Sequence, residues 1–142
     1  MAAKTARVKW AGDMTFIGES PSGHAVVMDA GEASGGRDHG IRPMEMLLLG
    51  AGGCASIDVI LILKKARQQV TDCWADLEAE RADEHPKVFK KIHMHFVVTG
   101  KDLDAKHVER AIALSMEKYC SASAQLGALA EITTDFEIRE AD

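Results

Sequence analysis

A long apolar run, residues 44–63, constrains the fold of this 142-residue chain more than any other feature. Pro43 stands directly before it, where proline suits the first turn of a helix because its missing N–H would have no partner there. Three basic residues follow within residues 64–67, and positive charge is favourable at the C-terminal end of a helix dipole. The sequence therefore predicts a helix that begins at Pro43 and ends near Gln69.

This predicted helix is apolar on every face. In its first two-thirds almost every side chain is apolar or small. The run has the length of a membrane span, roughly 20 residues, but Glu45 and Asp58 lie inside it, and charged groups are costly in hydrocarbon. We therefore expect a helix buried nearly all round in protein, and no membrane partner. Since one small sheet cannot cover it on every side, we expect a second copy of the chain to cover the rest in a homodimer.

Shorter elements flank the long helix. Runs of β-forming residues before it, separated by turn signals, predict an antiparallel meander, and the run 87–100 alternates with a period of two. The loop 31–42 is rich in glycine and charge, which is typical of a mobile segment. The order of elements predicts an α+β fold, with helices on a largely antiparallel sheet, in a single domain of residues 1–142. The predicted strands are 6–10, 14–18, 24–29, 71–82, 87–100 and 132–139, and the predicted shorter helices are 104–119 and 122–130.

The charge pattern argues against nucleic acid as a partner. Lys and Arg number 17 against 22 Asp and Glu, which gives a net charge of −5, and no basic block is present. The basic residues near the start have no apolar run behind them, which is unlike a secretory signal. We therefore expect a cytoplasmic protein, in which cysteines stay reduced unless they react.

Three cysteines are candidates for chemistry: Cys54, Cys73 and Cys120. Cys54 follows the small residues 50–53, in which each helical glycine costs about 1 kcal/mol of helix propensity. Such residues indicate either close packing of another helix or room for a substrate beside the thiol. Cys120 ends a predicted helix, where it would be partly accessible, whereas Cys73 is interpreted as structural. The 66 positions between Cys54 and Cys120 do not show whether the two meet.

Other polar residues give weaker indications. His93 and His95 share a strand face, but no third ligand is apparent, and an exposed polar face is the simpler interpretation. No Cys/His spacing matches a zinc site, so we expect no metal. Asp58 lies one turn after Cys54 on the same helix face, where a carboxylate raises the pKa of a thiol unless it is paired elsewhere.

Two segments of the chain resemble a known family. Residues 43–58, PMEMLLLGAGGCASID, together with 118–121, KYCS, resemble the OsmC/Ohr family of osmotically inducible and organic hydroperoxide resistance proteins. The resemblance covers essentially the whole chain and implies one OsmC-like domain that forms an intertwined homodimer, with two long central helices wrapped by sheets from both chains. Further segments are similar to the YhfA-like branch of the family: 6–10, 18–20, 22–24 and 96–100.

The resemblance also implies a redox reaction. Cys54 would attack an organic hydroperoxide and become a sulfenic acid. Cys120 would then form a disulfide with it, and an external dithiol, lipoyl-type in the family, would restore both thiols. The resemblance implies a thiol-dependent peroxide reductase that uses no metal, flavin or haem cofactor.

The activating residues of the family do not map directly onto this chain. In the family a glutamate directly follows the helix-opening proline and holds an arginine near the thiolate, but Met44 stands at that position here. Glu45 is the nearest acid, and Arg37 and Arg42 are the candidates for the cation. Two alternatives to a peroxidase therefore stay open: a non-catalytic dimer that binds an apolar ligand beside residues 50–54, and a thiol redox sensor.

Overall fold

The computed structural model describes residues 3–142, which divide into two compact units. The first unit ends at Leu47, and the second is Leu48–Asp142. Each unit contains one three-stranded sheet. The expectation of a single domain stays a prediction.

The N-terminal unit contains an antiparallel sheet. Its strands are β1 (Arg7–Trp10), β2 (Thr15–Glu19) and β3 (Ala25–Asp29), in the spatial order β1-β2-β3. Gly12 and Gly23 lie in the two turns between them with positive φ angles of 99° and 87°, a conformation that glycine adopts without steric cost. The predicted meander is confirmed, and each strand end lies within one residue of its expected position.

Asp29, at the end of β3, organises the loop that precedes the long helix. Its buried carboxylate accepts the backbone N–H groups of Ala30, Arg37 and His39 at 2.8, 3.2 and 3.0 Å. These bonds, above all the one from His39, hold the pKa of Asp29 below its usual value although burial opposes the shift. A short 3-10 helix, η1 (Glu32–Ser34), lies in the same loop. The loop that its composition marks as mobile is thus tied to the sheet.

The long helix α1 (Pro43–Lys65) begins at the predicted residue and crosses the division between the two units. It ends at Lys65 and not near Gln69, because Arg67 adopts a left-handed backbone (φ 59°) and Gln69 already begins a strand. By length and composition it is the one helix within residues 3–142 that could cross a membrane, a test that core helices also pass. In the single chain 28% of its most apolar stretch is buried, so the chain alone does not provide the cover expected on nearly every face.

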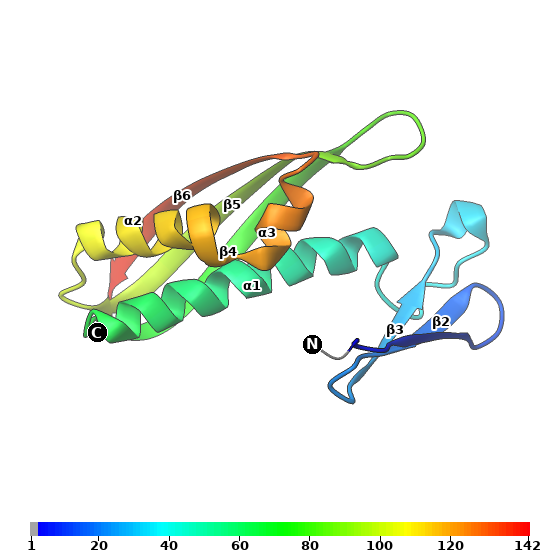
Figure 1. The fold of residues 1–142 in the computed structure, drawn as a ribbon, viewed down its shortest axis with the longest axis horizontal. Helices are drawn as coiled ribbons and strands as arrows, with labels where there is room; N and C mark the ends of the chain where they lie inside the picture. The colour runs from blue at the N-terminus through cyan, green and yellow to red at the C-terminus, as the bar shows by residue number, and fades with distance from the viewer. Residues whose placement is uncertain (1–2) are drawn as a thin grey trace. The chain divides into compact units, whose positions relative to one another are not determined.

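The C-terminal unit is built on the second sheet (Figure 1). Its strands are β4 (Gln69–Arg81), β5 (Phe89–Lys101) and β6 (Glu131–Glu140), in the spatial order β4-β5-β6. β4 and β5 form an antiparallel hairpin, which agrees with the largely antiparallel sheet predicted, whereas β6 lies parallel to β5. The parallel pair arises because the helices between β5 and β6 carry the chain back along the sheet before β6 begins.

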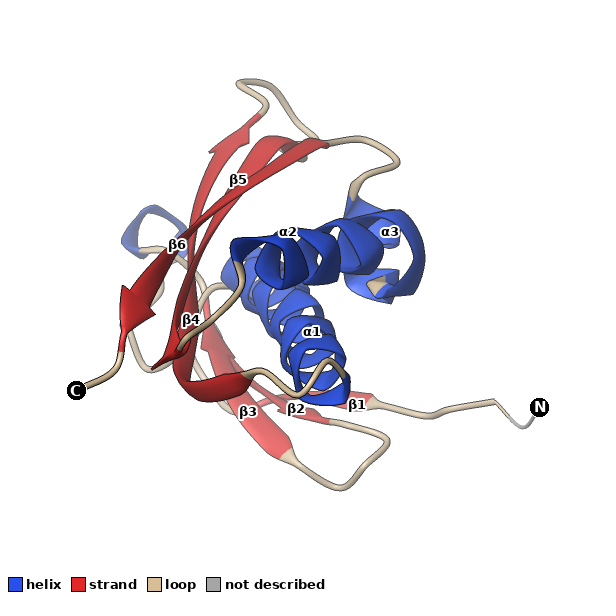
Figure 2. Cartoon of the chain, turned by 90° about the vertical axis from the view of Figure 1, so that its left-hand side faces the viewer, coloured by secondary structure: helices blue, strands red, loops and turns tan. Residues whose placement is uncertain are grey.

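Three helical segments connect β5 to β6 and lie on one face of this sheet (Figure 2). The first is capped by Asp104, whose carboxylate accepts the N–H of Lys106 at 2.9 Å. It passes directly into a π-helical turn, and Cys120 separates that turn from the last helix, which ends earlier than the predicted 122–130. The bounds are α2 (Ala105–Leu114), η2 (Ser115–Tyr119) and α3 (Ser121–Leu126).

The core of the C-terminal unit lies between its sheet and its helices. β5 alternates as predicted, so His93 and His95 lie on the face of the sheet opposite to the buried even-numbered side chains. α1 approaches the sheet closely at Gly52, where an added Cβ would lie 2.9 Å from Cδ1 of Leu77. This close approach explains one glycine of the helix. Fully buried core side chains include Val59, Leu63, Ile92, Met94, Phe96, Val98, Val108 and Ala111.

Candidate functional site

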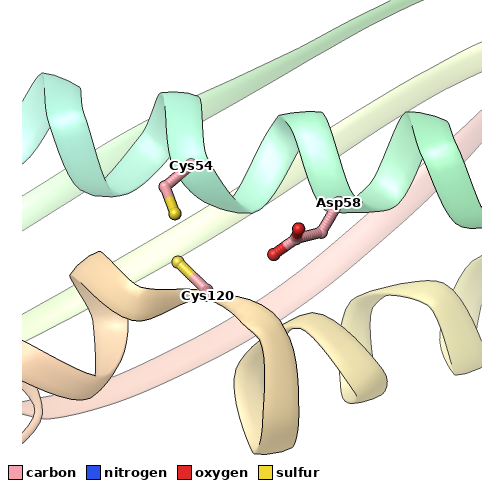
Figure 3. A group of neighbouring side chains, drawn as sticks. All are labelled: Cys54, Asp58 and Cys120. Atoms are coloured by element: carbon pink, nitrogen blue, oxygen red, sulfur yellow. The ribbon is translucent and has the colours of Figure 1, made fainter. Parts of the chain in front are cut away.

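Two cysteines and an aspartate from distant parts of the sequence meet in the C-terminal unit (Figure 3). The Sγ atoms of Cys54 and Cys120 and a carboxylate oxygen of Asp58 all lie within 4.8 Å of one another. Cys54 and Asp58 project from one side of α1 because they are one helical turn apart. Cys120 stands opposite them, between η2 and α3, and all three cysteines of the chain are free thiols. The fold therefore brings together two cysteines that sequence spacing alone could not pair.

The Cys120 thiol is the more enclosed of the two. Cys120 is 3% exposed, so the expectation that its position at a helix end makes it partly accessible is wrong, whereas Cys54 is half-buried. The Cys120 sulfur caps α3 by accepting the N–H of Ser123 at 3.3 Å, and its S–H donates to the Ser123 hydroxyl at 3.0 Å. Burial raises the pKa of Cys120 above its usual value, and Cys54 adds to the rise, although both contacts with Ser123 oppose it. Cys120 is therefore predominantly protonated at neutral pH.

Asp58 has a hydrogen-bond partner other than the thiols. The Ser115 hydroxyl donates to Oδ2 of Asp58 at 2.9 Å, and Ser115 is fully buried. The carbonyl of the same serine accepts the N–H of Cys120 at 2.8 Å. Ser115 thus connects the aspartate and the second cysteine from the first position of η2.

The two serines of the site were not identified from the sequence. Ser115 gives one signal, because it is a polar residue on the apolar face of the predicted helix 104–119. Ser123 lies in the polar stretch 121–123, where nothing distinguishes it from its neighbours. Both roles depend on contacts that only the folded chain creates.

The three accessory candidates lie in the N-terminal unit, and each has a partner there. The backbone N–H of Arg42 donates to Glu45 at 2.7 Å, and the Arg42 guanidinium pairs with Asp38 at 3.2 Å. Arg37 pairs with Asp13 at 3.4 Å, and both of these side chains are more than half exposed. A role for the three candidates beside the reactive thiol stays a prediction.

Cys73 lies on β4 and is half-buried. Burial raises the pKa of its thiol, and the negative charge of Asp72 adds to the rise. These conditions disfavour the reactive thiolate. They agree with the interpretation of Cys73 as a structural residue.

The two histidines of β5 belong to a polar network with β6. The ring nitrogens of His93 contact Thr133 Oγ1 at 2.7 Å and Asp135 at 2.8 Å. Those of His95 contact Asp135 at 2.7 Å and Glu137 at 3.1 Å. All four ring nitrogens thus have hydrogen-bond partners, which favours the expected polar face over a metal site.

An apolar cavity of about 540 Å³ lies in the N-terminal unit, between the sheet and the first turns of α1. This cavity is not the groove that we expected beside residues 50–54. A Cβ added at Gly50 or Gly53 would have no neighbouring atom within 4 Å. Those two glycines therefore border open space in the single chain. The cavity in the N-terminal unit is lined mainly by apolar residues, among them Val8, Val26, Met28, Pro43, Met46 and Leu47.

Known proteins resemble this chain in sequence and in structure. The model of the OsmC-like protein family matches residues 35–135. Protein YhfA of Escherichia coli strain K12 is 48% identical over 133 residues, which cover 94% of this chain and 96% of YhfA. The crystal structure of a hypothetical protein from Aquifex aeolicus is 30% identical over the full length of both chains, with a TM-score of 0.87.

A more distant structure extends the likeness of fold. An organic hydroperoxide resistance protein, OsmC, from Legionella pneumophila is 16% identical, covers 96% of this chain and 98% of its own, and has a TM-score of 0.71. These matches confirm the α+β fold and the resemblance to OsmC and YhfA noted in the sequence. The chain belongs to the OsmC-like protein family.

Proposed function

We propose that this protein reduces organic hydroperoxides through a dithiol–disulfide cycle of Cys54 and Cys120. The observation that carries the proposal is the meeting of the two sulfur atoms, within 4.8 Å, from positions 66 residues apart in the sequence. Membership of the OsmC-like family supports it, as does the shared fold with a protein described as an organic hydroperoxide resistance protein.

The environments of the two thiols support a first attack by Cys54. Cys54 is the more accessible, and burial holds Cys120 in its protonated form. The Cys54 thiolate attacks the O–O bond of a hydroperoxide ROOH, which yields Cys54 sulfenic acid and, after uptake of a proton, the alcohol ROH. The Cys120 thiol then attacks the sulfenic sulfur, and water leaves as the disulfide forms. An external dithiol, lipoyl-type by the family resemblance, reduces this disulfide.

The proposed active form is a homodimer in the cytoplasm. α1 exposes a broad apolar face in the single chain, with Leu49 and Ile57 63% exposed and Leu61 52% exposed. Contiguous apolar surface of this kind is typical of a face that a partner covers. A second copy of the chain would cover it, and the reducing cytoplasm would keep the dithiol ready to react.

Turnover of cumene hydroperoxide tests the proposal, with metal-free reduced protein and dihydrolipoamide as the reductant. We expect Cys54→Ser to abolish turnover, because it removes the attacking thiol. Cys120→Ser should leave Cys54 as a sulfenic acid that a dimedone probe traps. Cys73→Ser is the matched control, and it should retain turnover. Disulfide mapping by mass spectrometry should find the Cys54–Cys120 bond, and two free thiols after peroxide treatment would overturn the proposal.

A second candidate function is the binding of an apolar ligand without catalysis. The observation that favours it is the cavity of about 540 Å³ in the N-terminal unit, with its mainly apolar lining. Binding of a fluorescent fatty-acid probe, displaced by alkanes and combined with no hydroperoxide turnover, would support this function. Turnover that depends on Cys54 would exclude it, and disulfide formation without turnover would indicate a redox sensor.

A further inference from the structure

We propose that the reduced site binds one Zn²⁺ ion through Cys54, Asp58 and Cys120. Their three donor atoms lie within 4.8 Å of one another. Ligands at about 2.0–2.3 Å from a tetrahedral zinc ion lie roughly 3–4 Å apart. Small rotations of the three side chains would therefore place all donors around an ion between them.

The charges of the donors favour a divalent cation. A metal ion displaces the protons of the two thiols when it binds, and the resulting thiolates together with the carboxylate carry three negative charges. The side chains that hydrogen-bond to Asp58 and Cys120 are the hydroxyls of Ser115 and Ser123, which orient the donors without cancelling their charge. Thiolate and carboxylate are both ordinary zinc ligands, so the ion would neutralise most of the charge.

The hydrogen bond from Ser115 holds the aspartate as metal ligands are usually held. It uses Oδ2 of Asp58, and a carboxylate has four acceptor positions, so capacity for a metal remains. Hydrogen bonds behind the ligands fix their orientation in most metal sites. With three protein ligands the fourth position of zinc stays open, as in sites that admit water or a substrate. Asp58, which the dithiol cycle does not use, thereby gains a role.

Zinc and hydroperoxide would compete for the same two thiols, a consequence that rests on the proposed function. When ROOH oxidises the two metal-bound thiolates, the products are the Cys54–Cys120 disulfide, ROH and water. The reaction consumes two protons and transfers two electrons from sulfur to the peroxide oxygens. Since a disulfide has lost its thiolate charge, the Zn²⁺ ion leaves, and the site would release zinc on oxidation.

Titration of the reduced protein with Co²⁺ tests the binding without any peroxide. We expect one equivalent of Co²⁺ to give a sulfur-to-cobalt charge-transfer band and the intense visible bands of tetrahedral cobalt, both lost on addition of Zn²⁺. Cys54→Ser, Cys120→Ser and Asp58→Asn should each weaken binding by more than the about 10- to 100-fold typical of residues that only orient ligands. Ser115→Ala should fall within that range, and Cys73→Ser should bind as the unmodified chain does.

A second measurement uses the unmodified chain, so that it does not depend on the folding of any variant. One equivalent of Zn²⁺ should protect Cys54 and Cys120 from alkylation, read by mass spectrometry, while Cys73 reacts at its metal-free rate. Equal protection of all three cysteines, absence of the cobalt bands, or unchanged affinity in a folded Asp58→Asn variant would each overturn the zinc site. The peroxidase test uses metal-free protein, so the two proposals succeed or fail separately.

Discussion

Ser115 contacts both parts of the candidate site from a single buried position. Its hydroxyl donates to Asp58 and its carbonyl accepts the N–H of Cys120. A half-buried carboxylate in an apolar helix is costly unless it keeps a hydrogen-bond partner. The serine therefore permits an acid at position 58 and also fixes where the second cysteine begins to leave the helical turn.

We predict that Ser115→Ala destabilises the fold by about 1–3 kcal/mol, because the charged acceptor of Asp58 loses its donor. The backbone bond to Cys120 remains, so the loss belongs to the hydroxyl. Urea denaturation followed by circular dichroism measures the free energy of unfolding. Ser121→Ala, at an exposed position, is the control and should change it by less than about 0.5 kcal/mol. Equal effects of the two substitutions would contradict the prediction.

At this scale the sequence predicts residue types better than residue partners. Cys54 and Cys120 are identified through the family resemblance, and the need of Asp58 for a partner follows from its place in an apolar run. Its partner, Ser115, lies 57 positions further along the chain, and the two residues meet only because α1 packs against η2. No local pattern encodes such a contact.

The β5–β6 pair shows how two elements create a charge network. The period of two in β5 places His93 and His95 on one face, as the sequence predicts. Their acidic partners come from β6, which pairs with β5 in parallel with His95 opposite Asp135. Parallel pairing could not be predicted, because it depends on how the intervening helices pack and not on the strands themselves.

This network should make stability depend on pH. The hydrogen bond with Glu137, followed by the one with Asp135, raises the pKa of His95 above its ordinary 6.5. The stabilisation of the fold by protonated His95 is therefore fully present below pH 6.5 and is lost as the pH rises through the raised pKa. His95 is the main cause that lowers the pKa values of Asp135 and Glu137 below their ordinary 3.8 and 4.5. The stabilisation of the fold by the two ionised carboxylates is fully present above these ordinary pKa values and is lost as the pH falls through the lowered pKa values. The network is therefore strongest between about pH 5 and 6.

We predict that His95→Gln lowers the melting temperature most near pH 5.5 and much less at pH 8.5. Differential scanning calorimetry at both pH values measures the effect. His24→Gln, at an exposed position outside this network, is the matched control and should show little change at either pH. A melting-temperature difference for His95→Gln that does not vary with pH would contradict the assignment.

At the scale of the whole molecule, the main open question of packing is the apolar face of α1, which is exposed to solvent in the single chain. The apolar run predicts the helix and its need for cover, and the fold confirms that the single chain leaves large apolar side chains exposed. The division of the chain into two compact units could not be predicted, because the long helix crosses it without a break in pattern. A second copy of the chain is the cover that we propose for this face.

We predict that Ile57→Asp converts a homodimer into monomers, because a charge on the shared apolar face would be buried without a partner. Size-exclusion chromatography with light scattering gives the mass directly. Leu129→Asp is the matched control, since Leu129 is also exposed, at 74%, but lies outside α1. A monomeric unmodified chain at micromolar concentration, or dissociation by both substitutions, would contradict this interface.

The meeting of Cys54 and Cys120 has a consequence for the lifetime of the protein. A bond between them would close a loop of 66 positions that contains β4, β5 and α2. In the chain-entropy model such a cross-link stabilises the folded state by about 4 kcal/mol, because it lowers the conformational entropy of the unfolded chain. Oxidised molecules would therefore unfold more rarely and resist proteases longer than reduced ones. The amount of the protein in a cell would then stay higher for a time after exposure to peroxide, because the oxidised molecules are degraded more slowly.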